Sequence, residues 1–283
     1  MINTRPEHTL CESLDICDDA LSEISMILLM RRNFSISVYK DKCMKRRIAI
    51  RMRSSRCQDA AAYCILLRNS EEELDVLLKT LTIHVSQFFR NPPMFDKLRT
   101  TIIPLLYRQA RQSGNSVRIW SLGSASGEEA YSIALILRVN FALELREIST
   151  TINATDIDTD ILQTARNGLY SEDRLKEVPA NVRERYFQPQ GIRFQLADEI
   201  RDMVTFIPGD MSSPRSYSAH ELVLCRNTLI YFTRPDQEKI LHYLADSMPP
   251  GGILVLGKSE TLVGDVRRRF SSLCPEERMY RRI

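Results

Sequence analysis

Apolar residues recur at helical spacing through the first eighty residues of the chain. Residues 74–81 carry a leucine stripe that follows Ser70 and Glu73, the two members of a capping box at a helix start. Asp59 is placed to cap another helix, and residues 39–53 carry a third apolar stripe. The members of that third stripe are Met44, Ile48 and Met52. The pattern predicts an all-helical N-terminal domain that ends at residue 81.

After about residue 115 the pattern changes to short apolar runs that alternate with helical segments. The predicted strands cover residues 117–120, 151–155, 203–207, 221–225 and 252–256. The predicted helices cover residues 128–140, 160–166 and 234–246. Alternation of this kind predicts an α/β domain with a mostly parallel sheet and helices on both faces.

The stretch from about residue 168 to residue 202 fits this alternation poorly and is rich in charge. Residues 188–191 read Gln-Pro-Gln-Gly, which is typical of a turn, and they lie between two potential strands at residues 185–187 and 192–196. We therefore expect a small antiparallel β-subdomain inserted into the α/β domain.

Composition narrows the class of protein. Of the 283 residues 43% are hydrophobic and 27% are charged, as in a soluble globular protein of two domains. The longest apolar run, residues 26–30, is far shorter than the roughly 20 residues of a membrane span. The N-terminus lacks the apolar segment of a secretory signal. We expect a cytoplasmic protein without membrane insertion.

Cysteine and histidine usage gives no sign of a disulfide framework or a metal site. The seven cysteines are scattered and form no C-x-x-C pair, and the four histidines show no ligand spacing. Reduced thiols and chemistry without a metal are the expectation.

The helix predicted within residues 39–53 is strongly basic. It contains seven basic residues and a single acidic one, Asp41. The charge of the whole chain is nearly balanced, with 39 basic and 36 acidic residues. The basic residues are Lys40, Lys42, Lys45, Arg46, Arg47, Arg51 and Arg53. Two interpretations stay open: a solvated face with extended side chains, or a surface for a polyanionic partner.

A glycine-containing turn stands where the first predicted strand becomes a helix. Gly123 and Gly127 would let a ligand approach the backbone, but the turn is neither a P-loop nor a G-x-G-x-x-G motif. Glu128 and Glu129 follow directly. They suit a ligand with positive charge and hydroxyl groups, such as S-adenosylmethionine, or they simply complement the helix dipole.

Polar residues follow three more predicted strands. Asp156 ends the second strand, Asp210 follows the third, and residues 225–232 follow the fourth. Ligands of open α/β sheets bind outside the carboxyl ends of the strands, and an acidic residue after the second strand can accept from ribose hydroxyls. The sequence thus predicts one nucleoside-binding site at this edge. By contrast, Asn91 and Pro92 are predicted to begin a helix, with Asn91 as its cap.

Five segments resemble motifs of one known family, the chemotaxis receptor glutamate O-methyltransferases of the CheR type. They are Thr82–Arg90, Gly127–Ser132, Ala154–Asp158, Cys225–Phe232 and Leu256–Glu260. The resemblance implies a helical domain over residues 1–81 and a linker over residues 82–92 that contributes to the cofactor site. A Rossmann-like methyltransferase domain over residues 93–283, carrying the inserted β-subdomain, would complete the chain.

The same resemblance implies methyl transfer from S-adenosyl-L-methionine to receptor glutamates, with S-adenosyl-L-homocysteine as product. The cofactor contacts expected for this chain are His84, Ser86, Arg90, Gly123, Glu129, Asp156, Asp210, Met211, Arg226 and Asn227. Two of them depart from the family, because His84 and Asp210 stand where asparagine is usual. The alternative is a catalytically weakened, cofactor-binding signalling regulator of the same fold.

Arg90 and Tyr231 are the expected catalytic residues. A glutamate is ionised at neutral pH, since its ordinary pKa is about 4.3, so alignment and a suitable pocket matter more than a general base. Arg90 could hold the acceptor carboxylate with two hydrogen bonds. Tyr231 could add a third, or it could serve only as core packing.

The expected partners are acidic cytoplasmic helices of chemoreceptors, and the protein is expected to be a monomer. The basic residues expected to meet them are Lys42, Lys45, Arg46 and Arg53. Residues 187–192 form a short turn with a proline, so we do not expect the β-subdomain to tether a receptor peptide. The balanced charge argues against a nucleic-acid partner.

Overall fold

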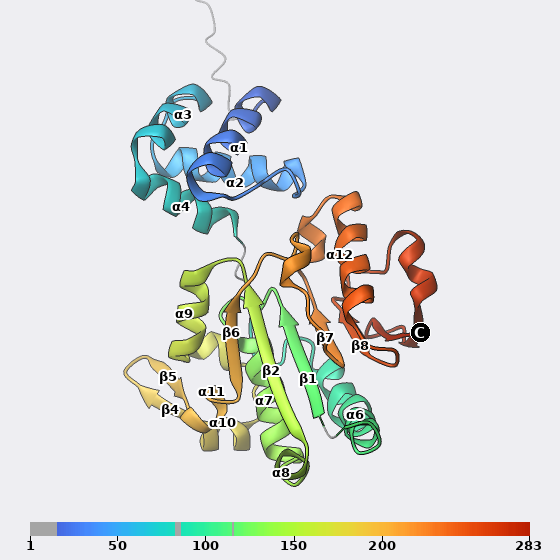
Figure 1. The fold of residues 1–283 in the computed structure, drawn as a ribbon. Coiled ribbons are helices and arrows are strands. Elements are labelled where there is room, and N and C mark those ends of the chain that lie inside the picture. The colour runs from blue at the N-terminus through green and yellow to red at the C-terminus, as the bar shows by residue number, and fades with distance from the viewer. Residues whose placement is uncertain (1–15, 83–85, 115) are drawn as a thin grey trace, which may run out of the picture. The chain divides into compact units, whose positions relative to one another are not determined.

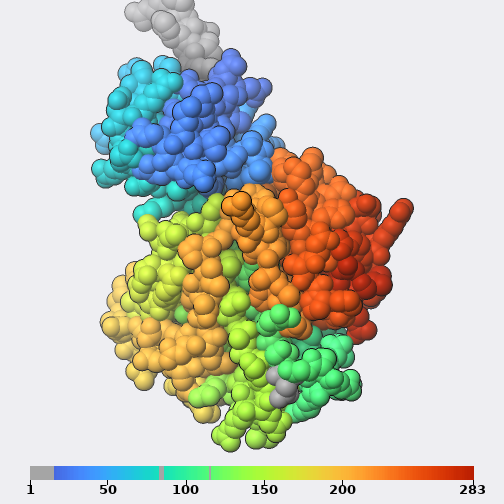
Figure 2. Space-filling model, in the orientation of Figure 1, coloured from blue at the N-terminus to red at the C-terminus, as the bar shows by residue number. Residues whose placement is uncertain are grey.

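The computed structural model describes residues 16–82, 86–114 and 116–283. These residues form two compact units that divide between residues 83 and 84, and each unit is described by itself (Figure 1). Figure 2 shows the side chains that fill the spaces between the ribbons. Within the described residues, no helix is both long and apolar enough to cross a membrane.

The first unit is all-helical, as predicted. Its described residues form α1 (Asp18–Arg32), α2 (Asp41–Ser54), α3 (Ala60–Asn69) and α4 (Glu71–Leu81). Helix α1 packs on α3, and α2 packs on α4. The predicted stripe on α2 is buried, with Met44, Ile48 and Met52 each 2% exposed or less. Burial of these apolar faces is what holds such short helices together.

The predicted capping box of α4 forms only in part. Ser70 accepts a hydrogen bond from the Glu73 N–H at 3.1 Å, as a capping serine should. The Glu73 carboxylate, however, accepts from the Arg51 guanidinium at 2.6 and 2.7 Å and from the Tyr63 hydroxyl at 2.9 Å. A bidentate arginine is a stronger partner than a backbone amide. The glutamate therefore joins three helices instead of closing its own cap.

The second unit contains a seven-stranded sheet in the order β6-β2-β1-β7-β8-β10-β9. Its strands are β1 (Ser116–Leu122), β2 (Ser149–Asp156), β6 (Val204–Pro208), β7 (Leu222–Cys225), β8 (Ile253–Leu256), β9 (Phe270–Cys274) and β10 (Met279–Arg282). The five predicted strands pair in parallel, which confirms the predicted α/β class. The last two strands, which the sequence pattern did not reveal, pair antiparallel beside β8.

Helices cover this sheet. The α-helices are α5 (Pro92–Lys97), α6 (Ile103–Ala110), α7 (Glu128–Asn140), α8 (Glu144–Glu147), α9 (Thr159–Asn167) and α12 (Arg234–Ser247). One π-turn, η1 (Leu98–Ile102), joins α5 to α6, and short 3-10 turns are η2 (Glu172–Leu175), η3 (Pro214–Ser216), η4 (Leu229–Tyr231) and η5 (Gly264–Arg269). Helix α7 is buried along most of its length, so the glutamates at its start lie inside the unit.

The inserted β-subdomain is present, but the strands inside it begin and end at other residues than expected. Strands β3 (Leu169–Ser171), β4 (Phe187–Gln190) and β5 (Arg193–Leu196) form an antiparallel sheet in the order β3-β5-β4. It is accompanied by α10 (Ala180–Tyr186) and α11 (Asp198–Arg201). Pro189 lies within edge strand β4, not in the turn, and Arg185 lies in α10 instead of a strand. An edge strand tolerates proline because its missing N–H can face away from the partner strand.

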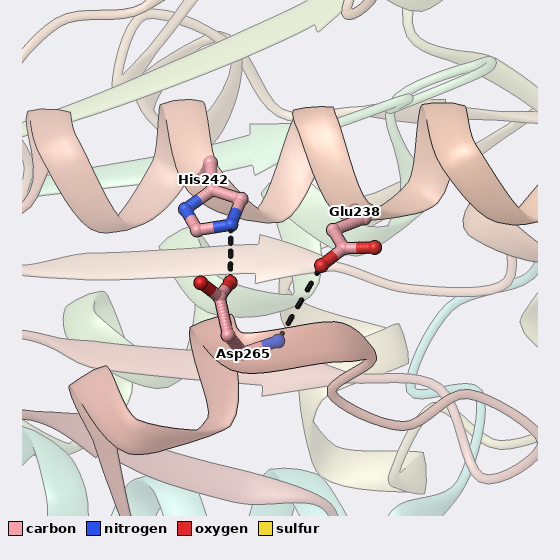
Figure 3. A group of neighbouring side chains, drawn as sticks. All are labelled: Glu238, His242 and Asp265. Atoms are coloured by element: carbon pink, nitrogen blue, oxygen red, sulfur yellow. Dashed lines mark hydrogen bonds and ion pairs between the residues drawn. The ribbon is translucent and has the colours of Figure 1, made fainter.

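Three polar side chains hold η5 against α12 (Figure 3). His242 Nε2 lies 2.8 Å from Asp265 Oδ1, and the Asp265 N–H donates to Glu238 Oε1 at 3.4 Å. These groups lie close enough together to be considered as metal ligands. Their mutual hydrogen bonds already account for the proximity, so we interpret the group as a brace between helix and turn.

Candidate cofactor-binding and active site

The loops that follow β1 and β7 meet at the carboxyl edge of the sheet. Gly123 has φ +73°, and a Cβ atom there would lie 2.7 Å from Thr228 Oγ1 and 3.3 Å from the Met211 methyl group. Only glycine fits both this backbone and this approach. The strand order reverses between β1 and β7, which is where open α/β sheets bind their ligands.

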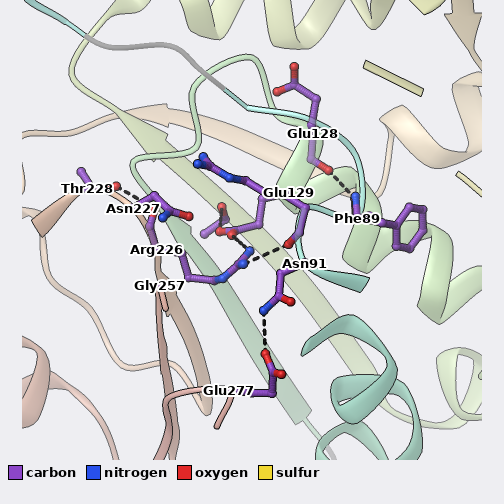
Figure 4. Close-up of polar contacts among 12 residues, drawn as sticks. Phe89, Asn91, Glu128, Glu129, Arg226, Asn227, Thr228, Gly257 and Glu277 are labelled. Atoms are coloured by element: carbon purple, nitrogen blue, oxygen red, sulfur yellow. Dashed lines mark hydrogen bonds and ion pairs between the residues drawn. The ribbon is translucent and has the colours of Figure 1, made fainter. Parts of the chain in front are cut away.

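A buried ion pair crosses this point. Arg226, 7% exposed, donates from Nη1 to Glu129 Oε2 and from Nη2 to the Arg90 carbonyl, each at 2.9 Å (Figure 4). The other Glu129 oxygen accepts from the Ser121 hydroxyl at 2.9 Å. Glu129 therefore does more than complement a helix dipole: with Arg226 it joins β1, β7 and the segment that carries Arg90.

Two polar atoms at the same edge are buried without a hydrogen-bond partner among the described residues: Ser124 Oγ and Arg226 Nε. Buried polar groups are normally hydrogen-bonded, so such atoms call for an explanation. They lie on the turn after β1 and on the loop after β7. A polar ligand at this edge would satisfy them.

The adjacent carboxylate, Glu128, has a different role. It is fully buried, accepts from the Ser126 hydroxyl at 2.7 Å and lies 3.5 Å from Arg174 Nη1, while Oε2 has no partner among the described residues. Arg174 comes from η2 of the inserted subdomain and donates to the Ser86 carbonyl. Glu128 therefore helps, through Arg174, to hold the segment at residues 86–90.

That segment is held at further points of its backbone. The Phe88 N–H donates to the Arg174 carbonyl at 3.1 Å, and the Phe89 N–H donates to Ser132 Oγ at 2.9 Å. Ser86 and Arg90, two expected contacts, are both half-buried. His84, the third expected contact in this stretch, lies outside the described residues.

Asp156 ends β2, as the sequence predicts. Its carboxylate accepts from the Ala125 N–H at 2.9 Å and from the Asp158 N–H at 3.1 Å, which ties it to the turn after β1. Asp158 caps α9 by accepting from Asp160 and Ile161, so its predicted place at a helix start is confirmed. The Asp156 carboxylate thus binds the turn after β1, whereas the Asp158 carboxylate caps the start of a helix.

Asp210 and Met211 lie in the turn that follows β6. Asp210 accepts from the Ser212 N–H and hydroxyl, all at 2.8 Å, and Met211 is 7% exposed beside Gly123. Much of the Asp210 hydrogen-bonding capacity is therefore used within its own turn. Asn227, with φ +59°, and the half-buried Tyr231 lie on the loop after β7.

Asn91 occupies the predicted position at the start of α5, but its side chain makes no cap hydrogen bond. It donates instead from Nδ2 to Glu277 Oε2 at 2.6 Å, across to the turn between β9 and β10 (Figure 4). The expectation of a side-chain cap is wrong because the Asn91 backbone is left-handed, with φ +72°, instead of the extended conformation from which a capping oxygen can accept.

Family models cover most of the chain. Residues 84–278 match "CheR methyltransferase, SAM binding domain", and residues 19–82 match "CheR methyltransferase, all-alpha domain". The chain belongs to the CheR methyltransferase family. S-adenosylmethionine is accordingly the cofactor of its second unit.

Named relatives of this CheR-family chain agree with that assignment. It is 36% identical over 202 residues to a "Probable chemotaxis protein methyltransferase" of Rhizobium etli, covering 70% of this chain and 75% of that protein. It is 31% identical to a "Chemotaxis protein methyltransferase" of Listeria innocua, covering 81% and 84%. A 104.1 kDa protein of Rhodobacter capsulatus is 34% identical over 94% of this chain, which spans only 28% of that protein's length.

The basic helix α2 lies in the first unit of this CheR-family chain, and its cations fall into two groups. Lys42, Arg46 and Arg53 are exposed. Lys45 donates to Asp18 at 2.5 Å, while Arg47 donates to the Thr80 carbonyl and Arg51 to Glu73. These three side chains bind partners inside the first unit, so less of their positive charge is available to a binding partner. The exposed Lys42, Arg46 and Arg53 carry the charge that α2 presents to solvent.

Arg174 and Glu260 have structural roles at the site, and neither was singled out from the sequence. Arg174 holds residue 86, and Glu260, 4% exposed, accepts from backbone amides of the loop after β7. Glu260 belongs to a motif segment, and a carboxylate just after an apolar strand is the signal that could have found it. Arg174 gives no local signal, because its partner is 88 residues away.

Proposed function

We propose that this protein transfers the methyl group of S-adenosylmethionine to glutamate carboxylates of chemotaxis receptors, forming glutamate methyl esters. The observation that carries the proposal is the Glu129–Arg226 pair with its hydrogen bond to the Arg90 carbonyl. It joins the cofactor edge of the sheet to the residue expected to hold an acceptor. The names of related proteins, "Chemotaxis protein methyltransferase" among them, supply the context of chemotaxis.

The residues proposed to bind the cofactor come from residues 84–90 and from segments at the carboxyl ends of β1, β2, β6 and β7. Glu129 and Asp156 would accept from amino and hydroxyl groups of the cofactor, and Arg226 and Ser124 have buried polar atoms that fit a polar ligand. The remaining proposed contacts are His84, Ser86, Arg90, Gly123, Asp210, Met211 and Asn227. A ligand with both positive charge and hydroxyls suits this mixture of carboxylates and hydroxyl groups.

S-adenosylmethionine supplies a methyl group on a positively charged sulfur. For the transfer, the acceptor glutamate must approach that carbon in line with the bond that breaks, and S-adenosylhomocysteine is the other product. The glutamate is already ionised at neutral pH, so this chain must orient it and exclude water. Arg90 would bind its carboxylate through the guanidinium fork, with Tyr231 as an additional hydrogen-bond donor.

The receptor contact proposed here is electrostatic. The exposed Lys42, Arg46 and Arg53 of α2, with Lys45 beside them, would meet acidic cytoplasmic receptor helices. Pro189 on the edge of the inserted sheet removes a donor that an added peptide strand would need. The proposal therefore includes a cytoplasmic monomer without a peptide tether on the β-subdomain.

The alternative is a regulator that binds the cofactor but turns over weakly. It is favoured by Asp210, whose carboxylate is engaged by Ser212. Labelled methyl transfer to receptor cytoplasmic fragments, followed by mild base, separates the two. A methyl ester releases its label in base, whereas cofactor binding without base-labile product would support the regulator. Arg90→Lys serves as the matched variant, because it keeps the charge but loses the fork.

A further inference from the structure

Glu260 is a buried carboxylate that collects four backbone N–H groups. Its Oε2 accepts from Gly257 at 2.7 Å and from Asn227 at 2.8 Å. Its Oε1 accepts from Thr228 at 2.8 Å and from Ile230 at 3.3 Å. Among the described residues, backbone amides are the hydrogen-bond partners of this carboxylate. One side chain thus fixes the loops that follow β7 and β8.

The two loops approach so closely that their shape depends on this carboxylate. A Cβ atom on Gly257 would lie 2.7 Å from Glu260 Oε2 and 2.8 Å from the Asn227 nitrogen, so only glycine fits. Asn227 adopts φ +59°, a conformation that costs free energy for a residue with a side chain. The amides of such a loop take no part in helix or sheet hydrogen bonds, so they need another acceptor.

Two opposing influences act on the pKa of the buried Glu260 carboxylate. Burial raises its pKa, and the hydrogen bonds from the four backbone amides lower the pKa without cancelling that rise. The folded protein therefore favours the protonated form relative to the unfolded chain. A protonated carboxyl, however, gives up acceptor capacity because one oxygen becomes a donor.

We propose that Glu260 is the positioning residue that shapes the loop at residues 226–231 for cofactor and acceptor binding. The inference rests on the proposed function, since that loop carries Asn227 and Tyr231. Glu260 touches neither ligand: it acts through the amides on which the two side chains are mounted. Displacing such a support by about 1 Å can lower a rate by about 100-fold.

The test compares Glu260→Gln with Glu221→Gln. Glu221 lies at the other end of β7 and accepts from the Arg118 N–H at 2.7 Å, so its variant also replaces a carboxylate that holds a backbone amide. Three quantities are measured on the full chain: amide hydrogen exchange, affinity for S-adenosylhomocysteine, and kcat for receptor methylation. Glu260→Gln places an NH₂ group where N–H donors need an acceptor.

We expect Glu260→Gln to lose exchange protection at residues 227, 228 and 257, to bind S-adenosylhomocysteine about tenfold more weakly and to lower kcat about tenfold or more. Glu221→Gln should leave all three quantities near wild type. Normal protection and affinity in Glu260→Gln, or an equal loss of affinity and kcat in Glu221→Gln, would overturn the proposal.

The design separates this inference from the proposed function. If the wild-type chain makes no base-labile receptor ester, the proposed function fails, while amide exchange and product binding still test the role of Glu260. If Glu260→Gln does not fold, Glu260→Asp keeps the charge with a shorter reach. Loss of protection at residues 227 and 228 in a folded Glu260→Asp would support the proposal, and full protection with normal kcat would contradict it.

Discussion

Two glutamates lie at opposite ends of strand β7 and are held in opposite ways: Glu221 directly precedes the strand, and Glu260, from the loop after β8, binds the loop that follows the strand. At its amino end Glu221 accepts from the Arg118 N–H at 2.7 Å and from the Arg118 guanidinium. Burial alone would raise the pKa of Glu221, but the hydrogen bonds and charge of Arg118 bring it below its usual value. At the carboxyl end Glu260 is bound by amides, and burial raises its pKa.

We interpret the amino end of the sheet as serving stability and the carboxyl end as the proposed ligand site. The partly exposed Arg118–Glu221 pair has side chains 43% and 23% exposed, and it neutralises its own charge. At the carboxyl end the Glu260 carboxylate accepts from backbone amides, and Ser124 and Arg226 carry buried polar atoms without a hydrogen-bond partner among the described residues. Of the five such atoms among the described residues, Ser124 Oγ, Glu128 Oε2 and Arg226 Nε lie on the turn after β1, the start of α7 and the loop after β7, and the other two are Arg201 Nε and Arg281 Nε.

The largest difference in stability and cofactor binding is expected between variants of Arg226 and Arg118. Arg226→Met leaves the nearly buried Glu129 without its cation, so we expect unfolding to become easier by about 3 kcal/mol and cofactor binding to be lost. Arg118→Met disturbs an exposed pair and should cost less than about 1 kcal/mol. Chemical denaturation and product titration measure both. Equal losses in the two variants would remove the distinction between the ends of the sheet.

A control strengthens this first comparison. The double variant Arg226→Met with Glu129→Gln removes the buried charge that the single variant strands. It should recover part of the lost stability but none of the cofactor affinity. Recovered affinity would show that the Glu129–Arg226 pair is structural only.

The next effect concerns two aspartates, Asp156 at the end of β2 and Asp158 just after it. Asp156→Asn should weaken S-adenosylhomocysteine binding about tenfold, because one carboxylate oxygen is replaced by a donor. Asp158→Asn is the matched control, since asparagine caps a helix as well as aspartate does. Calorimetric titration gives both affinities. Unchanged binding in Asp156→Asn would remove Asp156 from the cofactor site.

A smaller effect should appear in the pH dependence of stability. The folded-state pKa of Glu221 lies below its unfolded value, so its contribution is present at neutral pH and is lost as pH falls through the folded pKa. The folded-state pKa of Glu260 lies above its unfolded value. Its contribution is therefore present in acid, below the unfolded pKa, and is lost as pH rises through the folded pKa.

Thermal unfolding of wild type, Glu221→Gln and Glu260→Gln between neutral and acid pH measures these opposite slopes. The advantage of wild type over Glu221→Gln should shrink as pH falls, whereas its advantage over Glu260→Gln should grow. Parallel curves for the two variants would mean that the two carboxylates experience similar environments.

Periodicity predicted much of the fold because each predicted element buries its own apolar face. The stripe at residues 74–81 and the five parallel strands were visible locally. Strands β9 and β10 were missed, because residues such as Tyr280 become strand residues only by pairing with distant ones such as Leu254. Pro189 was placed in a turn because its neighbours resemble one, although an edge strand accommodates it.

The sequence allowed several site residues to be named, but it did not reveal their hydrogen-bond partners. Glu129, Asp156 and Arg226 could be named from their places at strand ends and from the family resemblance. Their partners depended on the folded chain: Arg226 reaches the carbonyl of residue 90, 136 residues away. Glu260 illustrates the same limit, since the loop it holds lies about thirty residues earlier. Sequence pattern identifies the ends of strands, but the fold decides which loops meet there.

The smallest effect is expected outside the sheet, on the basic helix α2. Reversing the exposed charges with Lys42→Glu, Arg46→Glu and Arg53→Glu should raise the apparent KM for receptor severalfold and leave product affinity unchanged. Exposed ion pairs contribute up to about 1 kcal/mol each and are screened over about 8 Å at physiological salt. Receptor methylation by wild type should therefore weaken as salt is raised.

Two variants make that last measurement specific. Arg146→Glu changes an exposed charge on α8 and should leave receptor kinetics unchanged. Lys45→Glu breaks the pair with Asp18, so it should lower the stability of the first unit as well as receptor affinity. Receptor kinetics that ignore the triple reversal, or a receptor peptide that binds tightly at high salt, would contradict an electrostatic contact. In that case the partner surface would have to be sought away from α2, and the edge of the inserted sheet would be the first place to test.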